Sequence, residues 1–150
     1  MTLAATVTAL VAAGLNASAA AYAGWRWWRV EPDAWSWWLI RSGQAAILAL
    51  ALVAAAAWLA GERPEDGLFW VYAFVPLGTS LFAEQFRILS AQTVLDARGL
   101  DEARAVGRLP EAEQRSIVLQ IARRELGVMA LAAAVNAFLA LRAVTEASGF

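Results

Sequence analysis

Four long stretches of this chain carry no charged side chain, and this pattern constrains the fold more than any other feature. The stretches cover residues 2–25, 42–61, 67–83 and 126–141. The hydrocarbon core of a bilayer is about 30 Å thick, and about 20 helical residues span it. The first two stretches meet this length. The other two reach it with flanking Arg and Glu residues, whose long side chains extend toward the headgroups. The sequence therefore predicts an all-α integral membrane protein.

We expect a single domain, residues 1–150, with four transmembrane helices at about residues 3–23, 37–60, 68–88 and 125–144. The composition agrees, because 61% of the residues are hydrophobic and 17% are charged, whereas soluble domains are about half apolar and a quarter charged. An alanine-rich soluble bundle is the alternative. A soluble helix keeps a polar face, however, and residues 48–60 and 126–135 show none.

The first charge-free stretch also resembles a cleavable signal peptide, because small residues at 19–23 fit a cleavage site. A signal peptide carries positive charge before its apolar region. Here no positive side chain precedes the stretch, and Arg26 and Arg29 follow it directly. We therefore expect a membrane anchor whose N-terminus lies outside.

The arginines predict the orientation of the helices. Ten of the 12 basic residues, all of them Arg, lie in or beside the first and third connections, whereas Arg63 and Arg142 lie on the opposite side. Positive residues favour the cytoplasmic side. The predicted protein is thus a multi-pass protein of the plasma (inner) membrane with cytoplasmic first and third loops and both termini outside. Residues 61–67, which are acidic and rich in Gly and Pro, predict a tight outer turn.

Tryptophans gather around the first connection. Six of the eight are Trp25, Trp27, Trp28, Trp35, Trp37 and Trp38. Amphipathic rings favour the headgroup level, so they predict an aromatic belt. With Arg26 and Arg29 between them, they suit the anionic headgroups of the inner leaflet through charge and cation–π contact. Single-stranded nucleic acid also stacks on such rings, but the net charge of −1 gives no general attraction. We expect a lipid partner and no nucleic acid.

Polar residues at one depth predict a cluster between the second and third spans. Glu84 lies 16 residues, or about 24 Å, from the outer start of its helix, and Arg41 lies near the inner start of the other. We expect an Arg41–Glu84 contact, completed by Gln44 and Arg87 at the i+3 positions. A structural clamp and a proton- or substrate-handling carboxylate both fit this cluster. Pro76 predicts a kink in the third span, because proline removes a backbone donor.

The segment between the third and fourth spans is the only large polar part. We expect a cytoplasmic helical hairpin at residues 88–124, with Gly99 ending its first helix and Pro110 starting a helix that continues into the fourth span. Ile88 and Leu95 would pack against Ile117 and Ile121. The alternative is an amphipathic helix that lies flat on the inner leaflet.

The residue types exclude several kinds of chemistry. The chain has no Cys, His or Lys, which excludes disulfides, thiol sites, His-based triads and Lys Schiff bases. No phosphate-binding loop or carboxylate cluster with metal-ligand spacing is visible. We expect no enzymatic activity, no cofactor and no metal. The leading hypothesis is a non-catalytic subunit, scaffold or adaptor that forms a homo-oligomer or joins a larger membrane complex. The alternative is a small transporter or channel that uses Glu84, Arg41, Gln44 and the Pro76 break.

Overall fold

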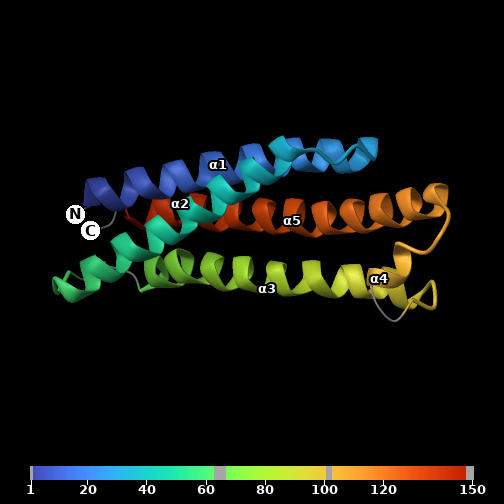
Figure 1. Ribbon diagram of the computed structural model, residues 1–150. Helices are drawn as coiled ribbons and strands as arrows, with labels where there is room; N and C mark the ends of the chain where they lie inside the picture. Colours follow the sequence, from blue (N-terminus) through green and yellow to red (C-terminus); the bar gives the residue numbers. More distant parts are fainter. Residues whose placement is uncertain (1, 63–66, 101–102, 148–150) are drawn as a thin grey trace.

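The computed structural model describes residues 2–62, 67–100 and 103–147, and within these ranges it is helical with no β-strand. The helices are α1 (Thr2–Arg29), α2 (Ala34–Leu59), α3 (Leu68–Asp96), α4 (Ala103–Val106) and α5 (Glu111–Ala147). Figure 1 shows the four long helices side by side, with α2 crossing the bundle diagonally. The first residues of α1 and the last residues of α5 lie at one end of the bundle. The last residues of α2 and the first residues of α3 lie at the same end.

Three helices are long and apolar enough to cross a membrane: Leu3–Arg29, Ala34–Leu59 and Glu111–Glu146. The expectation of an all-helical protein with membrane-spanning helices is confirmed to this extent. The fourth predicted span lies in α3, which has 29 residues but is not among the three in the described part of the chain. Every 18-residue window of α3 contains Glu84 and Gln85, which lower its mean hydropathy together with the Trp, Tyr, Pro, Gly, Thr and Ser residues.

The helices are longer than the predicted membrane spans, which followed bilayer thickness, and the continuous helix expected from Pro110 into the fourth span is present. The first helix continues past residue 23 to Arg29. The second begins at Ala34 and not at residue 37, because the Asp33 side chain accepts a hydrogen bond from the Ser36 amide and caps it. The fourth predicted span, 125–144, is the second part of α5, which starts at Glu111 without a break.

Small residues fill the interior of the bundle, and large apolar residues face outward. Ala9, Ala12, Ala54, Ala73 and Ala140 are completely buried in one core cluster, so the helix backbones approach closely. The outward-facing large side chains include Leu52, Leu81, Phe82, Leu131 and Phe138. Exposed apolar side chains in this number are typical of a surface covered by lipid or by another protein.

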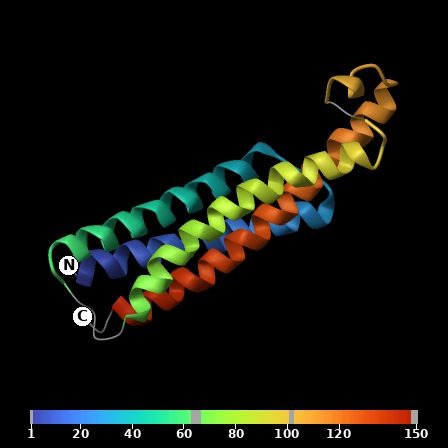
Figure 2. The ribbon, with the colours of Figure 1, turned by 90° about the horizontal axis from the view of Figure 1, so that it is seen from below.

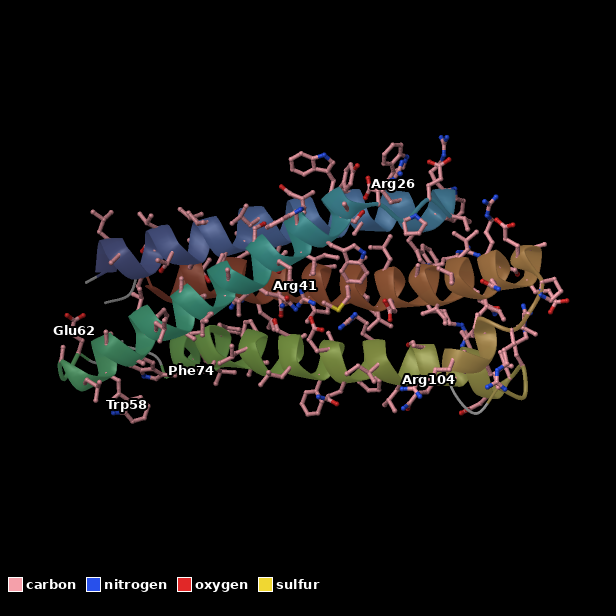
Figure 3. All side chains as sticks on the ribbon, in the orientation of Figure 1. Arg26, Arg41, Trp58, Glu62, Phe74 and Arg104 are labelled. Carbon is pink, nitrogen blue, oxygen red and sulfur yellow. The ribbon has the colours of Figure 1, made fainter. Side chains whose placement is uncertain are left out.

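Two ends of the bundle differ in character. Beyond the α1–α2 connection, α3 and α5 continue as a pair past the other two helices, and α4 lies at the tip of this extension (Figure 2). Figure 3 places Arg26 and Arg104 toward this end and Glu62 at the opposite one. At the end with Glu62, the aromatic rings of Trp58, Phe69, Trp70 and Phe74 form a cluster with centroid separations of 5.2–6.5 Å.

Three helices end in the same hydrogen-bond pattern, in which one residue takes a positive φ. At Gly61 (φ 81°) and Gly99 (φ 66°) this residue is glycine, as expected for this helix end. After α1 it is Val30, with φ 57°. The Val30 amide donates to Trp27 O at 3.2 Å and the Glu31 amide to Arg26 O at 3.1 Å. A β-branched residue in this conformation is strained.

Replacing Val30 with glycine should stabilise the protein by about 1 kcal/mol, because it relieves the strain of a left-handed backbone conformation. The measurement is reversible unfolding of the detergent-solubilised protein. The opposite change at the equivalent position, Gly99→Val, should lower the stability by a similar amount. A Val30→Gly variant that is less stable than the wild type would show that the packing of the Val30 side chain outweighs the backbone strain.

Candidate functional site

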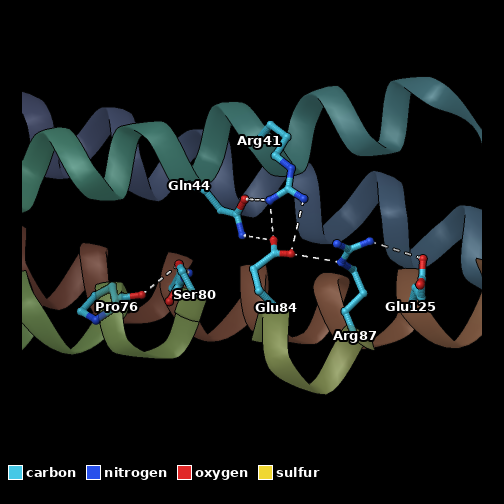
Figure 4. Close-up of polar contacts among 8 residues, drawn as sticks. Arg41, Gln44, Pro76, Ser80, Glu84, Arg87 and Glu125 are labelled. Atoms are coloured by element: carbon cyan, nitrogen blue, oxygen red, sulfur yellow. Dashed lines mark hydrogen bonds and ion pairs between the residues drawn. The ribbon is translucent and has the colours of Figure 1, made fainter. Parts of the chain in front are cut away.

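The predicted polar cluster joins α2 to α3 (Figure 4), and Figure 3 places Arg41 near the middle of the bundle. The guanidinium of Arg41 contacts both carboxylate oxygens of Glu84 and donates to Gln44 Oε1 at 2.6 Å. Gln44 Nε2 donates to Glu84 Oε1 at 3.0 Å, and Arg87 Nε donates to Glu84 Oε2 at 3.0 Å. All four residues expected in this cluster are therefore in contact through Glu84.

Helical spacing positions these side chains. Arg41 and Gln44 are three residues apart on α2, and Glu84 and Arg87 are three residues apart on α3, so each pair shares one helix face. Arg87 also reaches a third helix, because its Nη1 lies 3.7 Å from Glu125 Oε2 on α5. Glu125 was not expected in this cluster, although its position at the inner edge of a charge-free stretch was a usable signal.

The cluster is an alternating chain of charges that links three helices. Its order is Arg41, Glu84, Arg87 and Glu125, so two positive groups balance two negative ones. The Arg87 guanidinium also lies 5.7 Å from the centre of the Trp37 ring on α2. Such ion pairs fix the positions of the helices relative to one another. An unpaired charge in an apolar environment finds few other partners, so separating the helices is costly.

Pro76 lies inside α3, which continues from Leu68 to Asp96. Proline has no amide hydrogen, so it cannot bond to the carbonyl of Tyr72, four residues earlier. The neighbouring hydroxyls do not replace this bond. Thr79 Oγ1 donates to Val75 O at 3.1 Å, and Ser80 Oγ donates to Pro76 O at 3.0 Å. These two hydroxyls donate to the carbonyls of Val75 and Pro76. They do not donate to the carbonyl of Tyr72, which is the one that loses its usual amide donor.

The six tryptophans near the first connection fall into two groups. Trp25, Trp28, Trp35 and Trp38 are more than half exposed. Trp37 packs beneath Arg87. Trp27 lies between α1 and α5, with the Arg123 guanidinium 5.4 Å from its ring centre. A Cβ atom at Gly127 would lie 2.7 Å from Trp27 Nε1. Trp27 is nevertheless 38% exposed, so Trp37 is the one ring of the six that is mostly covered.

The exposed Trp25 ring lies near both arginines of its segment. The guanidinium carbons of Arg26 and Arg29 lie 5.7 and 5.9 Å from its centre. Both arginines also form ion pairs with Glu31, at 3.1 and 3.9 Å. The Arg and Trp side chains are thus close enough for cation–π contact, as the sequence indicated. The positive charge of both arginines is partly neutralised by Glu31 of the same connection.

Asp33, which was not among the expected site residues, organises the connection between α1 and α2. Its Oδ1 accepts from the Ser36 amide at 3.0 Å and the Ser36 hydroxyl at 2.6 Å, and its Oδ2 accepts from the Tyr22 hydroxyl at 2.7 Å. Arg26 Nε lies 3.4 Å from Oδ2. Burial acts to raise the pKa of Asp33, but the bonds from Ser36 and Tyr22 and the charge of Arg26 outweigh it, so the pKa is lowered. An Asp three residues before a Ser, ahead of an apolar run, was the available signal.

The segment at residues 88–124 forms a helical hairpin from the end of α3 and the start of α5. Ile117 is buried, and Ile121 and Leu95 are partly buried. Ile88 is 49% exposed, so its predicted place in the hairpin core is wrong. Arg87 turns toward α5, and Val94, seven residues later on the same face, is buried in place of Ile88. Arg98 Nη2 donates to Gln120 Oε1 at 3.3 Å across the hairpin.

No family model, curated protein or solved structure matches this chain. In residues 2–62, 67–100 and 103–147, no group of three or more His, Cys, Asp and Glu side chains is placed to bind a metal ion. The groups that the site does present are guanidinium, carboxylate and carboxamide groups, and these bond to one another.

Proposed function

We propose that the chain is a four-span membrane protein in which α3 provides the remaining span. With 29 residues, α3 is about 43 Å long, which exceeds the hydrocarbon thickness of about 30 Å. The large outward-facing side chains on α3, including Leu81 and Phe82, support contact with lipid. Two polar groups of α3 are directed away from this surface, because Ser80 is buried and Glu84 bonds to α2 and to Arg87.

The proposed orientation places the hairpin end in the cytoplasm and both chain ends outside, in the plasma membrane. The α1–α2 connection and the hairpin lie at the same end of the bundle (Figures 1 and 2), and the arginine-rich segments of the sequence belong to this end. Positive residues retained on the cytoplasmic side support this assignment. The exposed Trp25, Trp28, Trp35 and Trp38 would then lie at the level of the anionic headgroups of the inner leaflet.

Within this frame, the proposed role is that of a non-catalytic subunit, scaffold or adaptor that docks a partner through the hairpin. The observation that carries the proposal is the extension of α3 and α5 beyond α1 and α2 (Figure 2). Val118 on this extension is 60% exposed, and Leu119 is exposed beside it. An exposed apolar strip on an otherwise charged helix is typical of a protein-binding surface.

A groove at the base of the hairpin strengthens this interpretation. It has a volume of about 520 Å³ and lies between the α1–α2 connection, at Pro32, and the exposed face of α5. Apolar Val118, Leu119 and Ala122 line it together with polar Glu111, Gln114 and Arg115. An apolar floor with a charged rim is the usual composition of a site that binds another protein. A second copy of the chain and a different subunit both fit this description.

Transport is the alternative function, and the contacts of Glu84 favour a clamp instead. Its two oxygens accept from Arg41, Gln44 and Arg87, so a solute or proton would have to displace these donors. A flux assay in liposomes separates the two functions. A transporter that depends on Glu84 loses flux in a Glu84→Gln variant, whereas a clamp leaves the background flux of the liposomes unchanged.

The proposed role predicts that a crosslinker on the hairpin captures a defined partner. A photo-crosslinking residue at Val118 should yield one dominant adduct, with a second copy or another subunit, in crosslinking mass spectrometry of membranes. Phe138 on the same helix is 63% exposed but lies far from the hairpin, so a crosslinker there should give a different product. An Ala122→Glu change in the groove should reduce the Val118 adduct at least fivefold. Capture of lipid alone at Val118 would contradict the proposal.

A further inference from the structure

One polar residue from each of the four long helices meets at a small cavity inside the bundle. These residues are Asn16 of α1, Gln44 of α2, Ser80 of α3 and Asn136 of α5. The cavity volume is about 10 Å³, and Ile40 of α2 with Met129 and two alanines of α5 completes its lining. Every long helix contributes a polar side chain to this layer, whereas the surrounding core is apolar. Buried polar groups in an apolar core need hydrogen-bond partners.

The side chain of Asn136 leaves one such requirement open. It is 2% exposed, and its Nδ2 donates to Ser80 Oγ at 2.9 Å. Ser80 Oγ in turn donates to Pro76 O (Figure 4). The carboxamide oxygen of Asn136 is buried and accepts no hydrogen bond from any residue that the structure describes. A buried acceptor without a donor costs about 1–3 kcal/mol, so a native structure usually supplies one.

The other polar groups of the layer retain hydrogen-bonding capacity. Asn16 uses its Nδ2 to donate to Ala12 O at 2.9 Å and Gly43 O at 3.0 Å. Gln44 donates one Nε2 hydrogen to Glu84, and a carboxamide nitrogen has two. Ser80 Oγ donates one bond and accepts one, and a hydroxyl has a second lone pair. The cavity lining thus offers both donors and acceptors.

We propose that this cavity binds one water molecule, which donates a hydrogen bond to Asn136 Oδ1. The volume of about 10 Å³ is close to the minimum that holds a single water, and a buried water needs two to four polar partners. Gln44, Asn16 and Ser80 supply the others. A bare cation fits less well, because the lining groups are neutral and the adjacent Arg41–Glu84–Arg87–Glu125 chain already balances its own charges.

The water would join two polar regions into one network. Gln44 lines the cavity and also donates to Glu84, so it connects the ionic cluster with Asn136, and Ser80 lies one helical turn before Glu84. All four long helices then share a continuous set of hydrogen bonds. Such buried networks specify the register in which helices pack, since a shifted helix leaves several groups unpaired.

Met129 gives a direct test, because it lines the cavity and is 1% exposed. Radiolytic hydroxyl-radical labelling of the purified protein oxidises buried side chains only where water is bound beside them. We expect Met129 to be oxidised in the wild type. We expect at least a tenfold slower oxidation in Asn136→Leu, which fills the cavity and removes the acceptor. Oxidation of the exposed Trp38 should be equal in both proteins. A wild-type Met129 that stays protected would overturn the proposal.

Two further measurements keep the result decisive. Ala132→Val adds volume to the cavity wall without removing a polar group, so it should also slow Met129 oxidation. This variant replaces Asn136→Leu in the test if Asn136→Leu does not fold. Replacing sodium with choline at constant ionic strength should leave the melting temperature unchanged. A sodium-dependent melting temperature in the wild type that is lost in Asn136→Leu would identify a cation and contradict the assignment of water.

Discussion

Replacing Glu84 with alanine should lower the free energy of unfolding by about 2 kcal/mol, because removing this partly buried carboxylate leaves its partner charges uncompensated. Here two guanidinium groups, those of Arg41 and Arg87, would face the space left by one carboxylate. The measurement is unfolding in mixed micelles with increasing denaturing detergent. Glu146→Ala is the matched control, since this residue pairs with Arg142 within one helix, and such pairs contribute less than about 1 kcal/mol.

A double-mutant cycle separates the contact itself from other effects of Glu84→Ala. If Arg41 and Glu84 act as a clamp, the losses from Arg41→Ala and Glu84→Ala should overlap by about 1 kcal/mol or more in the double variant. Glu84→Gln should retain part of the stability, because its amide oxygen can still accept from Arg41. Losses that add within about 0.5 kcal/mol would show that the two residues do not stabilise each other.

Replacing Gly43 with alanine should lower the stability by about 2 kcal/mol, the usual cost of overpacking a dense core. The new Cβ would lie 2.9 Å from Asn16 Oδ1 and 3.0 Å from Asn16 Cγ. Asn16 cannot easily move away, because its Nδ2 is bonded to Ala12 O and to Gly43 O. The crossing of α1 and α2 would therefore have to widen. Unfolding in detergent measures the loss.

Gly14 supplies the control for this substitution, since a Cβ added there meets nothing within 4 Å. Gly14→Ala should be neutral or stabilising, because alanine favours a helix over glycine by about 1 kcal/mol. Shortening the obstructing side chain should relieve the strain, so Gly43→Ala should cost much less in an Asn16→Ala background. A Gly43→Ala protein as stable as Gly14→Ala would contradict the close contact between α1 and α2.

The class of fold was predictable because it depends on local sequence. A run of residues without charge needs only its own length to indicate a span, and helix starts such as Pro110 are local signals as well. The Arg41–Glu84 contact was accessible by counting residues from each helix end to a common depth. This succeeded because an α-helix rises by a constant 1.5 Å per residue.

Features that depend on how helices cross were not accessible. The interior contact between Asn16 and Gly43 follows from the diagonal course of α2, which nothing in the local sequence encodes. Glu125 joined the cluster because α5 packs beside α3 at the level of Arg87. The rotation of α3 about its own axis, which directs Arg87 toward α5, also directs Ile88 outward and Val94 inward. Each of these outcomes depends on the rotation of a helix about its own axis.

The uninterrupted course of α5 has a mechanical consequence. Its 37 residues form a rod about 55 Å long, which reaches from the hairpin to the opposite end of the bundle (Figure 1). A continuous helix bends little, so tilting the hairpin by a load at its tip must also displace the far end of α5. The contact of Trp27 with Gly127 lies close to the point where α5 leaves the other helices. This contact would act as the pivot about which a displaced hairpin moves the opposite end of α5.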